Sequence, residues 1–166
     1  MLSFLPNVIF DRLTQITPDY LHARGLTLLL MDFDNTMLPY TTDTPPQALL
    51  DWLACMEASG VRLCIVSNSR KSRVLEFSAR YGVPCVTGAR KPATNGIRRA
   101  MERFSALDTE TALVGDQIFT DVLGANLANI TSIQVKSIHN HTFWLKLRHV
   151  FEVPFLRMAR KRRVEQ

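Results

Sequence analysis

The fold is decided by one stretch of sequence, residues 26–36, which reads LTLLLMDFDNT. Apolar residues fill most of its first half, which is typical of a strand buried on both faces, so we predict a strand over residues 26–33. Asp32 and Asp34 stand two positions apart at its end, so their side chains point the same way on an extended chain. Two buried carboxylates are unfavourable unless something compensates them. A hard divalent cation would do so; the alternative for residues 32–36 alone is a polar turn.

Strand and helix patterns alternate along the rest of the chain. Thr17, Pro18 and Asp19 form a helix-start signal, and Gly25 ends that short helix. Further helices are predicted over residues 45–59, 71–81, 92–104 and 120–129, and further strands over 61–66, 83–86, 111–114 and 130–135. Such alternation implies parallel strands joined by right-handed crossovers. We therefore predict an α/β fold with a Rossmann-like parallel sheet flanked by helices.

Several polar residues that could take part in catalysis or ligand binding fall at or shortly after the predicted strand ends. Parallel sheets bind ligands at this edge. Ser67 can donate a hydrogen bond to a phosphoryl oxygen, and Lys91 can neutralise charge on a transferring group. Asp116 can be a second metal carboxylate, with Asp121 one helical turn beyond. Each has an ordinary alternative, as a helix cap, a solvated loop lysine or an acid at a helix N-terminus. Their common position at strand ends, with Asp32 and Asp34, favours a single site.

The chain resembles the haloacid dehalogenase (HAD) superfamily over nearly its whole length. Residues 32–36 (DFDNT) match the family's DxDx[TV] motif, Ser67 matches the serine after the second strand, and Lys91 matches the lysine of the third motif. Residues 115–121 (GDQIFTD) match the acidic fourth motif. The residues of these motifs are similar to those of the YqeG-type (subfamily IIIA) phosphatases. That branch is in turn similar to phosphatidylglycerophosphate phosphatases.

The resemblance implies a phosphatase mechanism with catalytic roles for Asp32, Asp34 and Lys91. Asp32 would attack phosphorus and form an aspartyl phosphate. Asp34 would protonate the leaving alcohol and then take a proton from the hydrolytic water. Ser67, Asn68 and Lys91 would hold the transferred phosphate.

The resemblance also implies Mg²⁺ as the cofactor. Its ligands would be Asp32, the main-chain carbonyl of Asp34, and Asp116, together with the phosphate. The cation lets a carboxylate and a phosphate approach each other without mutual repulsion. Asp121 would support the site from behind these ligands or through a metal-bound water.

The spacing of the motifs leaves no room for a cap domain. Asp32 and Ser67 are 35 positions apart, and Ser67 and Lys91 are 24 positions apart. The predicted helices and strands fill both intervals. We expect an open site that accepts a phosphate presented on something large, unless a partner subunit supplies a lid.

Positive charge is concentrated at the C-terminus. The chain carries a net charge of +5, yet residues 136–166 alone hold eight Lys or Arg against two Glu. We expect residues 1–140 to form the HAD-like core with its short N-terminal helix, and residues 141–166 to be a basic amphipathic segment of the same domain. That segment is either a last helix on the sheet with a solvated end, a contact with anionic membrane through residues 143–163, or a contact with RNA or a ribosome.

These features predict a phosphomonoester hydrolase, with phosphatidylglycerophosphate as one candidate substrate. The alternatives are a small-molecule phosphatase with a partner's lid and an RNA- or ribosome-binding protein, RNA being the less favoured. Three cysteines without CxxC spacing and no convincing targeting segment predict a cytoplasmic protein, with peripheral contact to the inner membrane face as an extension. The sequence makes no prediction of oligomeric state.

Overall fold

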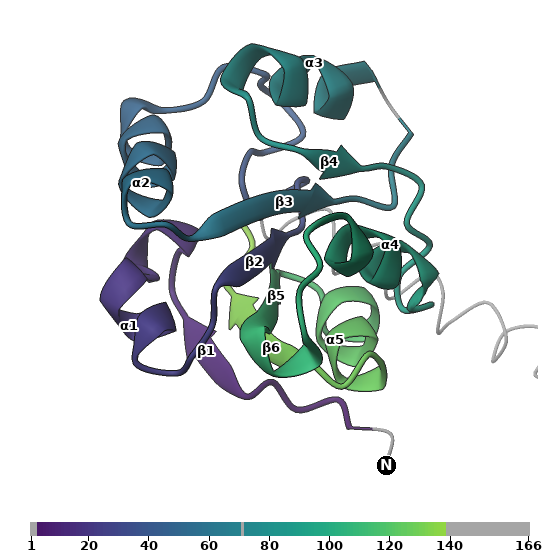
Figure 1. Ribbon diagram of the computed structural model, residues 1–166. Helices are drawn as coiled ribbons and strands as arrows, with labels where there is room; N and C mark the ends of the chain where they lie inside the picture. The colour runs from purple at the N-terminus through teal and green to yellow at the C-terminus, as the bar shows by residue number, and fades with distance from the viewer. Residues whose placement is uncertain (1–2, 71, 139–166) are drawn as a thin grey trace, which may run out of the picture.

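The computed structural model describes residues 3–70 and 72–138, which form a sheet with helices on both sides (Figure 1). In these residues, six parallel strands lie in the order β1-β6-β5-β2-β3-β4. The strands are β1 (Val8–Phe10), β2 (Leu28–Met31), β3 (Arg62–Val66), β4 (Cys85–Val86), β5 (Thr111–Gly115) and β6 (Thr131–Val135). The predicted Rossmann-like parallel sheet is confirmed.

Helices cover the two faces of the sheet in separate groups. The first face packs against α1 (Pro18–His22), α2 (Gln47–Ala58) and α3 (Ser72–Tyr81), and the second against α4 (Asn95–Arg103) and α5 (Leu123–Leu127). In β2, Leu29 and Met31 join the first core, whereas Leu28 and Leu30 join the second. This alternation follows from the two-residue period of a strand. It explains why every residue of β2 is apolar.

The register of the sheet brings the predicted site residues to one edge. Met31 at the end of β2 pairs with Ile65 of β3 and Val114 of β5. Asp32 therefore lies one position short of the level of Ser67 and Asp116. Because all three follow parallel strands, their side chains gather at the carboxyl edge of the sheet.

The structure differs from the predicted elements at several places: the strands predicted over residues 26–33 and 83–86 are shorter, Leu28–Met31 and Cys85–Val86. β1 was not predicted, because a three-residue strand at the sheet edge carries too short a pattern to be recognised. The helix expected from residue 92 begins at Asn95, after a turn. The helix expected over residues 120–129 is a π-helical turn, η3 (Ile118–Val122), followed by α5. Two short 3₁₀ turns, η1 (Leu13–Gln15) and η2 (Asp108–Glu110), complete the set of elements in the described residues.

The carboxyl edge of the sheet carries no inserted domain in the described part of the chain. Only a loop, α2 and β3 lie between Asp32 and Ser67, and only α3 and β4 between Ser67 and Lys91. The predicted absence of a cap is confirmed for these residues. Residues 139–166, which hold the predicted basic segment, lie outside the described residues.

None of the helices in residues 3–70 and 72–138 has the length and apolar content needed to cross a membrane.

Candidate active site

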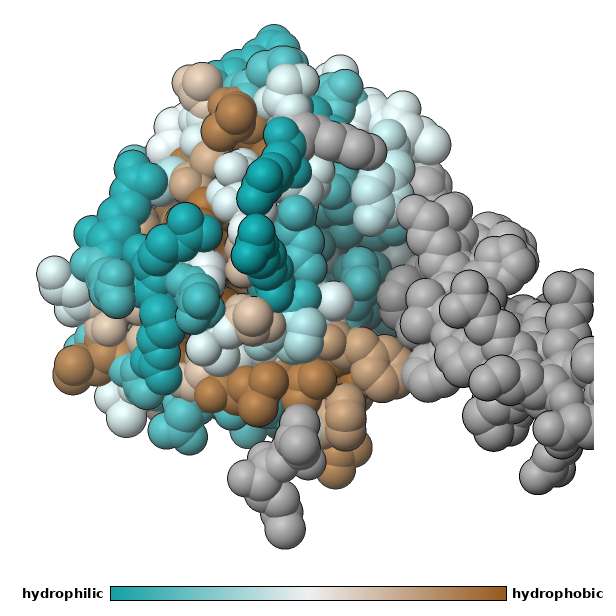
Figure 2. Space-filling view, turned by 90° about the vertical axis from the view of Figure 1, so that its right-hand side faces the viewer, coloured by the Kyte–Doolittle hydropathy of each residue, from teal (hydrophilic) through white to brown (hydrophobic). Residues whose placement is uncertain are grey.

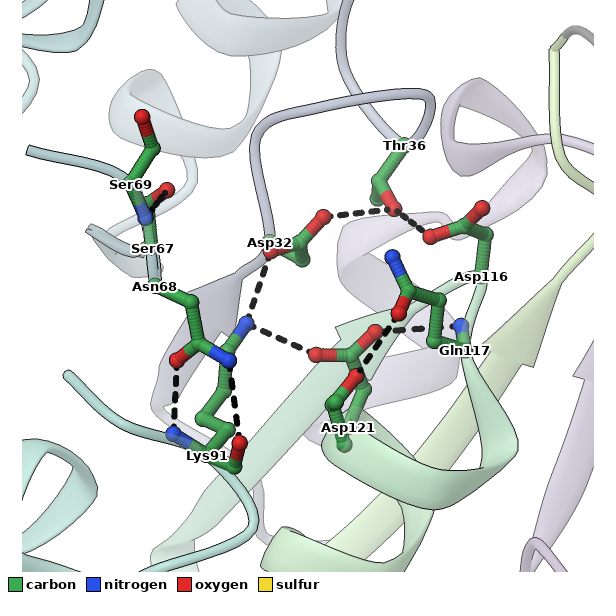
Figure 3. A network of polar contacts seen from close by, with 10 residues as sticks. Asp32, Thr36, Ser67, Asn68, Ser69, Lys91, Asp116, Gln117 and Asp121 are labelled. Atoms are coloured by element: carbon green, nitrogen blue, oxygen red, sulfur yellow. Dashed lines mark hydrogen bonds and ion pairs between the residues drawn. The ribbon is translucent and has the colours of Figure 1, made fainter. Parts of the chain in front are cut away.

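Lys91 is the centre of the candidate site. Its ammonium Nζ lies 2.7 Å from Asp32 Oδ1 and 2.7 Å from Asp121 Oδ1, and the lysine side chain is 1% exposed. Figure 3 shows it between the two carboxylates. Burial by itself would lower the pKa of Lys91, but Asp121 and Asp32 outweigh it and hold that pKa above its ordinary value. The lysine is therefore a permanent cation in this site.

Asn68 fixes the main chain of Lys91. Its Oδ1 accepts a hydrogen bond from the Lys91 amide at 2.6 Å, and its Nδ2 donates one to the Lys91 carbonyl at 2.9 Å. The predicted phosphate contact of Asn68 remains a prediction, since its side-chain amide serves the lysine here. Neighbouring Ser67 is buried, and its Oγ accepts a hydrogen bond from the Ser69 amide.

Three carboxylates form a group at this edge. Asp32, Asp116 and Asp121 each offer an oxygen within 4.8 Å of the others. Thr36 Oγ1 lies 3.4 Å from both Asp32 Oδ2 and Asp116 Oδ1, which are long distances for hydrogen bonds. Burial, with Asp32 and Asp121 nearby, raises the pKa of Asp116 to about 7. Within the described residues, the buried Asp116 Oδ2 has no hydrogen-bond partner.

Asp121 is placed by the π-helical turn that follows β5. Its Oδ2 accepts a hydrogen bond from the Gln117 amide at 3.0 Å, while its Oδ1 pairs with Lys91. The side chain lies directly over Gly115: a Cβ at that position would come within 2.3 Å of Asp121 Cγ. Burial raises the pKa of Asp121, against the opposing effect of Lys91. Both oxygens of this carboxylate are therefore already engaged.

Asp34 points to a different partner. Its Oδ1 accepts a hydrogen bond from Arg73 Nη1 at 2.7 Å, and both side chains are 11% exposed. Tyr40 lies near the same group: burial, followed by the charges of Asp34 and Asp32, raises its pKa to about 12. The side chain of Asp34 therefore belongs to the rim of the site, while Asp32 and Asp116 belong to its floor.

The carboxylate group fits a divalent cation. Three carboxylates and one ammonium group together carry a net charge of −2. One divalent cation would balance this charge. The partnerless Asp116 Oδ2 is an orphaned buried acceptor of the kind that a cation satisfies. Carboxylate oxygens are also the ligands that hard cations prefer.

Sequence reasoning missed Arg73 and the close contact of Asp121 with Lys91. Arg73 is the second residue of α3, five positions after Asn68, and a single exposed-looking arginine in a helix carries no signal of its partner. The sequence indicated Asp121 as support for a metal site. Its ion pair with Lys91 depends on the π-helical turn, which no local sequence pattern predicts.

Comparison with known proteins gives consistent matches. A family profile described as HAD-hydrolase-like matches residues 88–144. The probable phosphatase YqeG of Bacillus subtilis is 33% identical over 123 residues, which cover 74% of this chain and 72% of that protein. The chloroplastic phosphatidylglycerophosphate phosphatase 1 of Chlamydomonas reinhardtii is 26% identical over 145 residues, covering 81% of this chain but only 53% of that protein.

A solved structure supports the fold. The 3-deoxy-D-manno-octulosonate 8-phosphate phosphatase of Yersinia pestis superposes with a TM-score of 0.54 at 14% identity, covering 77% of this chain and 72% of that chain. An identity this low supports the fold alone. The sequence match to YqeG is the stronger evidence, because it combines 33% identity with coverage of most of both chains. The chain therefore belongs to the HAD-like phosphatases, as a member of the YqeG family.

Proposed function

We propose that this phosphatase hydrolyses phosphomonoesters with Mg²⁺, through an aspartyl phosphate formed on Asp32. One observation carries the proposal: a buried group of three carboxylates with one lysine, gathered at the carboxyl edge of a parallel sheet. The acid–base and phosphate-holding residues that we propose lie at the same edge.

Asp32 is the proposed nucleophile. The contact with Lys91 at 2.7 Å restricts its rotamer, so the carboxylate is held ready for attack. Its oxygen forms a bond to phosphorus while the bond from phosphorus to the leaving oxygen breaks. Asp34, in its protonated form, gives its proton to that leaving oxygen. It then accepts a proton from the water that hydrolyses the aspartyl phosphate.

Asp32, Asp116 and the main-chain carbonyl of Asp34 are the proposed ligands of Mg²⁺. Bound there, the cation would supply charge neutralisation and Lewis acidity for the phosphoryl group. Asp121 supports the site by pairing with Lys91, since both of its oxygens already have partners. Ser67, Asn68 and Lys91 are the proposed contacts of the phosphoryl oxygens.

Replacing Asp32 with Asn tests the nucleophile. The change is nearly isosteric, so the fold should persist, while turnover of p-nitrophenyl phosphate should fall by at least about a thousandfold. Acid quenching during turnover of a labelled substrate should trap the label on Asp32 in the wild type and not in the variant. Asp51→Asn, at an exposed position of α2, is the matched control. Activity of Asp32→Asn within about tenfold of wild type would exclude Asp32 as nucleophile.

Phosphatidylglycerophosphate is the substrate that we propose. The match to a phosphatase of that lipid supports it, as does a site without a cap in the described residues, because a lipid phosphate must be reached at a membrane surface. The surface also suits a bilayer: Phe4, Leu5 and Phe119 are exposed apolar side chains, and Figure 2 shows an apolar band along its lower part. The basic residues 143–163 would add attraction to anionic lipid, so we propose that the enzyme binds peripherally to the cytoplasmic membrane face.

A substrate panel tests this choice. Magnesium-dependent phosphate release is measured from phosphatidylglycerophosphate in mixed micelles, from nucleoside monophosphates and from sugar phosphates. The lipid should be hydrolysed with the highest kcat/KM. Faster turnover of soluble monophosphates would instead support a small-molecule phosphatase with a lid from a partner subunit. Absence of turnover together with tight RNA binding would support an RNA- or ribosome-associated role.

A further inference from the structure

Arg73 connects α3 to the loop that follows the first motif. Its Nη1 donates to Asp34 Oδ1 at 2.7 Å, and its Nε donates to Asp43 Oδ1 at 2.8 Å. Its Nη2 donates to the carbonyls of Pro39 at 2.9 Å and Thr42 at 2.7 Å. All four acceptors belong to residues 34–43, so one guanidinium holds this whole segment.

The helix that carries Arg73 is itself fixed to the first motif. Phe77, one turn further along α3, packs edge to face on Phe33, with ring centroids 5.3 Å apart. The guanidinium carbon of Arg73 lies 5.2 Å from the centroid of the same Phe33 ring. Residues four positions apart share a helix face. Phe33 stands between Asp32 and Asp34, so the arginine is anchored relative to both carboxylates.

We propose that Arg73 is the positioning residue for Asp34, setting the orientation in which that carboxyl group exchanges its proton. The proposal rests on the acid–base role proposed above for Asp34. An aspartate carboxyl group can rotate about two side-chain bonds, and proton transfer requires a heavy-atom separation of roughly 2.6 to 3.2 Å. The hydrogen bond from Arg73 to Asp34 Oδ1 fixes that oxygen and thereby sets the direction in which Oδ2 points. The two carbonyl contacts keep the loop from carrying Asp34 away.

A purely structural role for Arg73 predicts a different result. The pair with Asp34 is largely buried, so loss of either partner would destabilise the fold and would lower the amount of active enzyme. That loss would affect every substrate by the same factor. A positioning role acts on proton transfer alone, and its effect depends on how strongly the leaving group needs a proton.

Two aryl phosphates of nearly the same shape separate these roles. When Asp32 displaces phenolate from phenyl phosphate, the basic leaving oxygen needs the proton of Asp34. p-Nitrophenolate is stable as an anion and departs without it. The ratio kcat/KM reports the steps up to departure of the leaving group, and excludes hydrolysis of the aspartyl phosphate, so it isolates the acid role.

The test compares Arg73→Gln with Arg80→Gln, a matched control on an exposed position of the same helix. In Arg73→Gln, kcat/KM for phenyl phosphate should fall at least about tenfold more than kcat/KM for p-nitrophenyl phosphate, within the range that general acid catalysis supplies. Arg80→Gln should change neither. Equal losses for the two substrates in Arg73→Gln would overturn the proposal.

Asp34→Asn in the same assay separates failure of this inference from failure of the proposed function. If Asp34→Asn shows the leaving-group effect and Arg73→Gln does not, only the positioning role is wrong. If Asp34→Asn shows none, the acid role of Asp34 is wrong, and the role of Arg73 is overturned with it. The double variant should lose no more than Asp34→Asn alone, because both act on one step.

Arg73→Lys provides the test if Arg73→Gln does not fold. Lysine keeps the positive charge beside Asp34, but it lacks the planar fork that serves four acceptors. We expect it to fold and to show a leaving-group effect between that of wild type and that of Asp34→Asn. Wild-type values of kcat/KM for both substrates would overturn the proposal.

Discussion

At the scale of single residues, the site depends on a balance of charge around Lys91. One ammonium faces Asp32 and Asp121 directly, and Asp116 completes the carboxylate group. Without a cation, two negative charges are left over. Burial, followed by the charges of Asp32 and Asp121, raises the pKa of Asp116 to about 7, and a proton on Asp116 would remove part of this excess.

The stability of the metal-free protein should therefore depend on pH. The pKa of Asp116 rises from 3.8 in the unfolded chain to about 7 in the folded one, so the folded state holds the extra proton between these values. The contribution of Asp116 to the free energy of unfolding is therefore largest below about pH 4. It decreases as the pH rises toward about 7, by at most about 4 kcal/mol. Thermal unfolding in EDTA at a series of pH values measures this slope.

Mg²⁺ should reverse the trend, because it binds only the deprotonated carboxylates. The rise in Tm on adding MgCl₂ should be larger at about pH 8 than at about pH 5. Asp116→Asn is the matched variant, being nearly isosteric and unable to ionise. It should lose the pH slope assigned to this group and most of the Mg²⁺ effect. The same Mg²⁺ shift in variant and wild type would contradict a metal site that includes Asp116.

At the scale of elements, the π-helical turn η3 is what brings Asp121 to Lys91. The amides of Asp121 and Val122 both donate to the carbonyl of Gln117, at 2.9 and 3.3 Å, which widens this turn. Such turns are common at functional sites. The widened turn leaves the Asp121 side chain over the end of β5, where Gly115 provides the space.

Gly115→Ala should displace Asp121 and disable the site. The new Cβ would lie 2.3 Å from Asp121 Cγ, so the carboxylate must move away from Lys91. We expect kcat for p-nitrophenyl phosphate to fall by about a hundredfold, as a small misplacement in an active site can cause.

Asp121→Ala is the comparison for this prediction, and the double variant should lose little beyond either single change, because both remove the same contact. If Gly115→Ala kept wild-type kcat while Asp121→Ala lost it, the close packing of Gly115 on Asp121 would not matter for catalysis.

At the scale of the whole molecule, strand order and charge distribution set the surroundings of the site. β2 lies in the middle of the sheet, between β5 and β3. The first motif therefore lies between Ser67, which follows β3, and Asp116, which follows β5. Residues 136–166 carry a net charge of +6, which exceeds the +5 of the whole chain, because residues 1–135 sum to −1. A neutral catalytic body with a basic segment suits a substrate held at an anionic surface.

Neutralising the basic cluster should therefore weaken action on lipid but not on soluble substrates. Replacing Arg160, Lys161, Arg162 and Arg163 with Gln should lower kcat/KM for phosphatidylglycerophosphate in anionic mixed micelles by at least about tenfold, at roughly 1 kcal/mol of attraction per basic residue. Turnover of p-nitrophenyl phosphate should not change.

The matched control neutralises four exposed arginines elsewhere: Arg12, Arg80, Arg99 and Arg103. Equal losses in the two four-residue variants would mean that total charge, rather than the C-terminal cluster, governs the lipid reaction.

The sequence by itself determined the fold class and which residues of the candidate site gather at one edge of the sheet. An apolar run that ends in two aspartates identifies a buried central strand, and the repeat of strand and helix implies parallel pairing. Parallel strands share a carboxyl edge, so the pattern of strands predicts that Asp32, Ser67 and Asp116 lie close together. Local patterns suffice here because burial and periodicity are properties of neighbouring residues.

Tertiary structure alone decided the contacts between charged groups. Arg73 meets Asp34 across 39 positions, and Lys91 lies between Asp32 and Asp121. β1 joins β6 at the sheet edge, and a π-helical turn replaces the start of the expected α-helix. These outcomes depend on register, helix orientation and rotamer, which are set by packing between segments far apart in the chain. No stretch of sequence encodes them locally, because the free energy that selects them arises only when those segments meet.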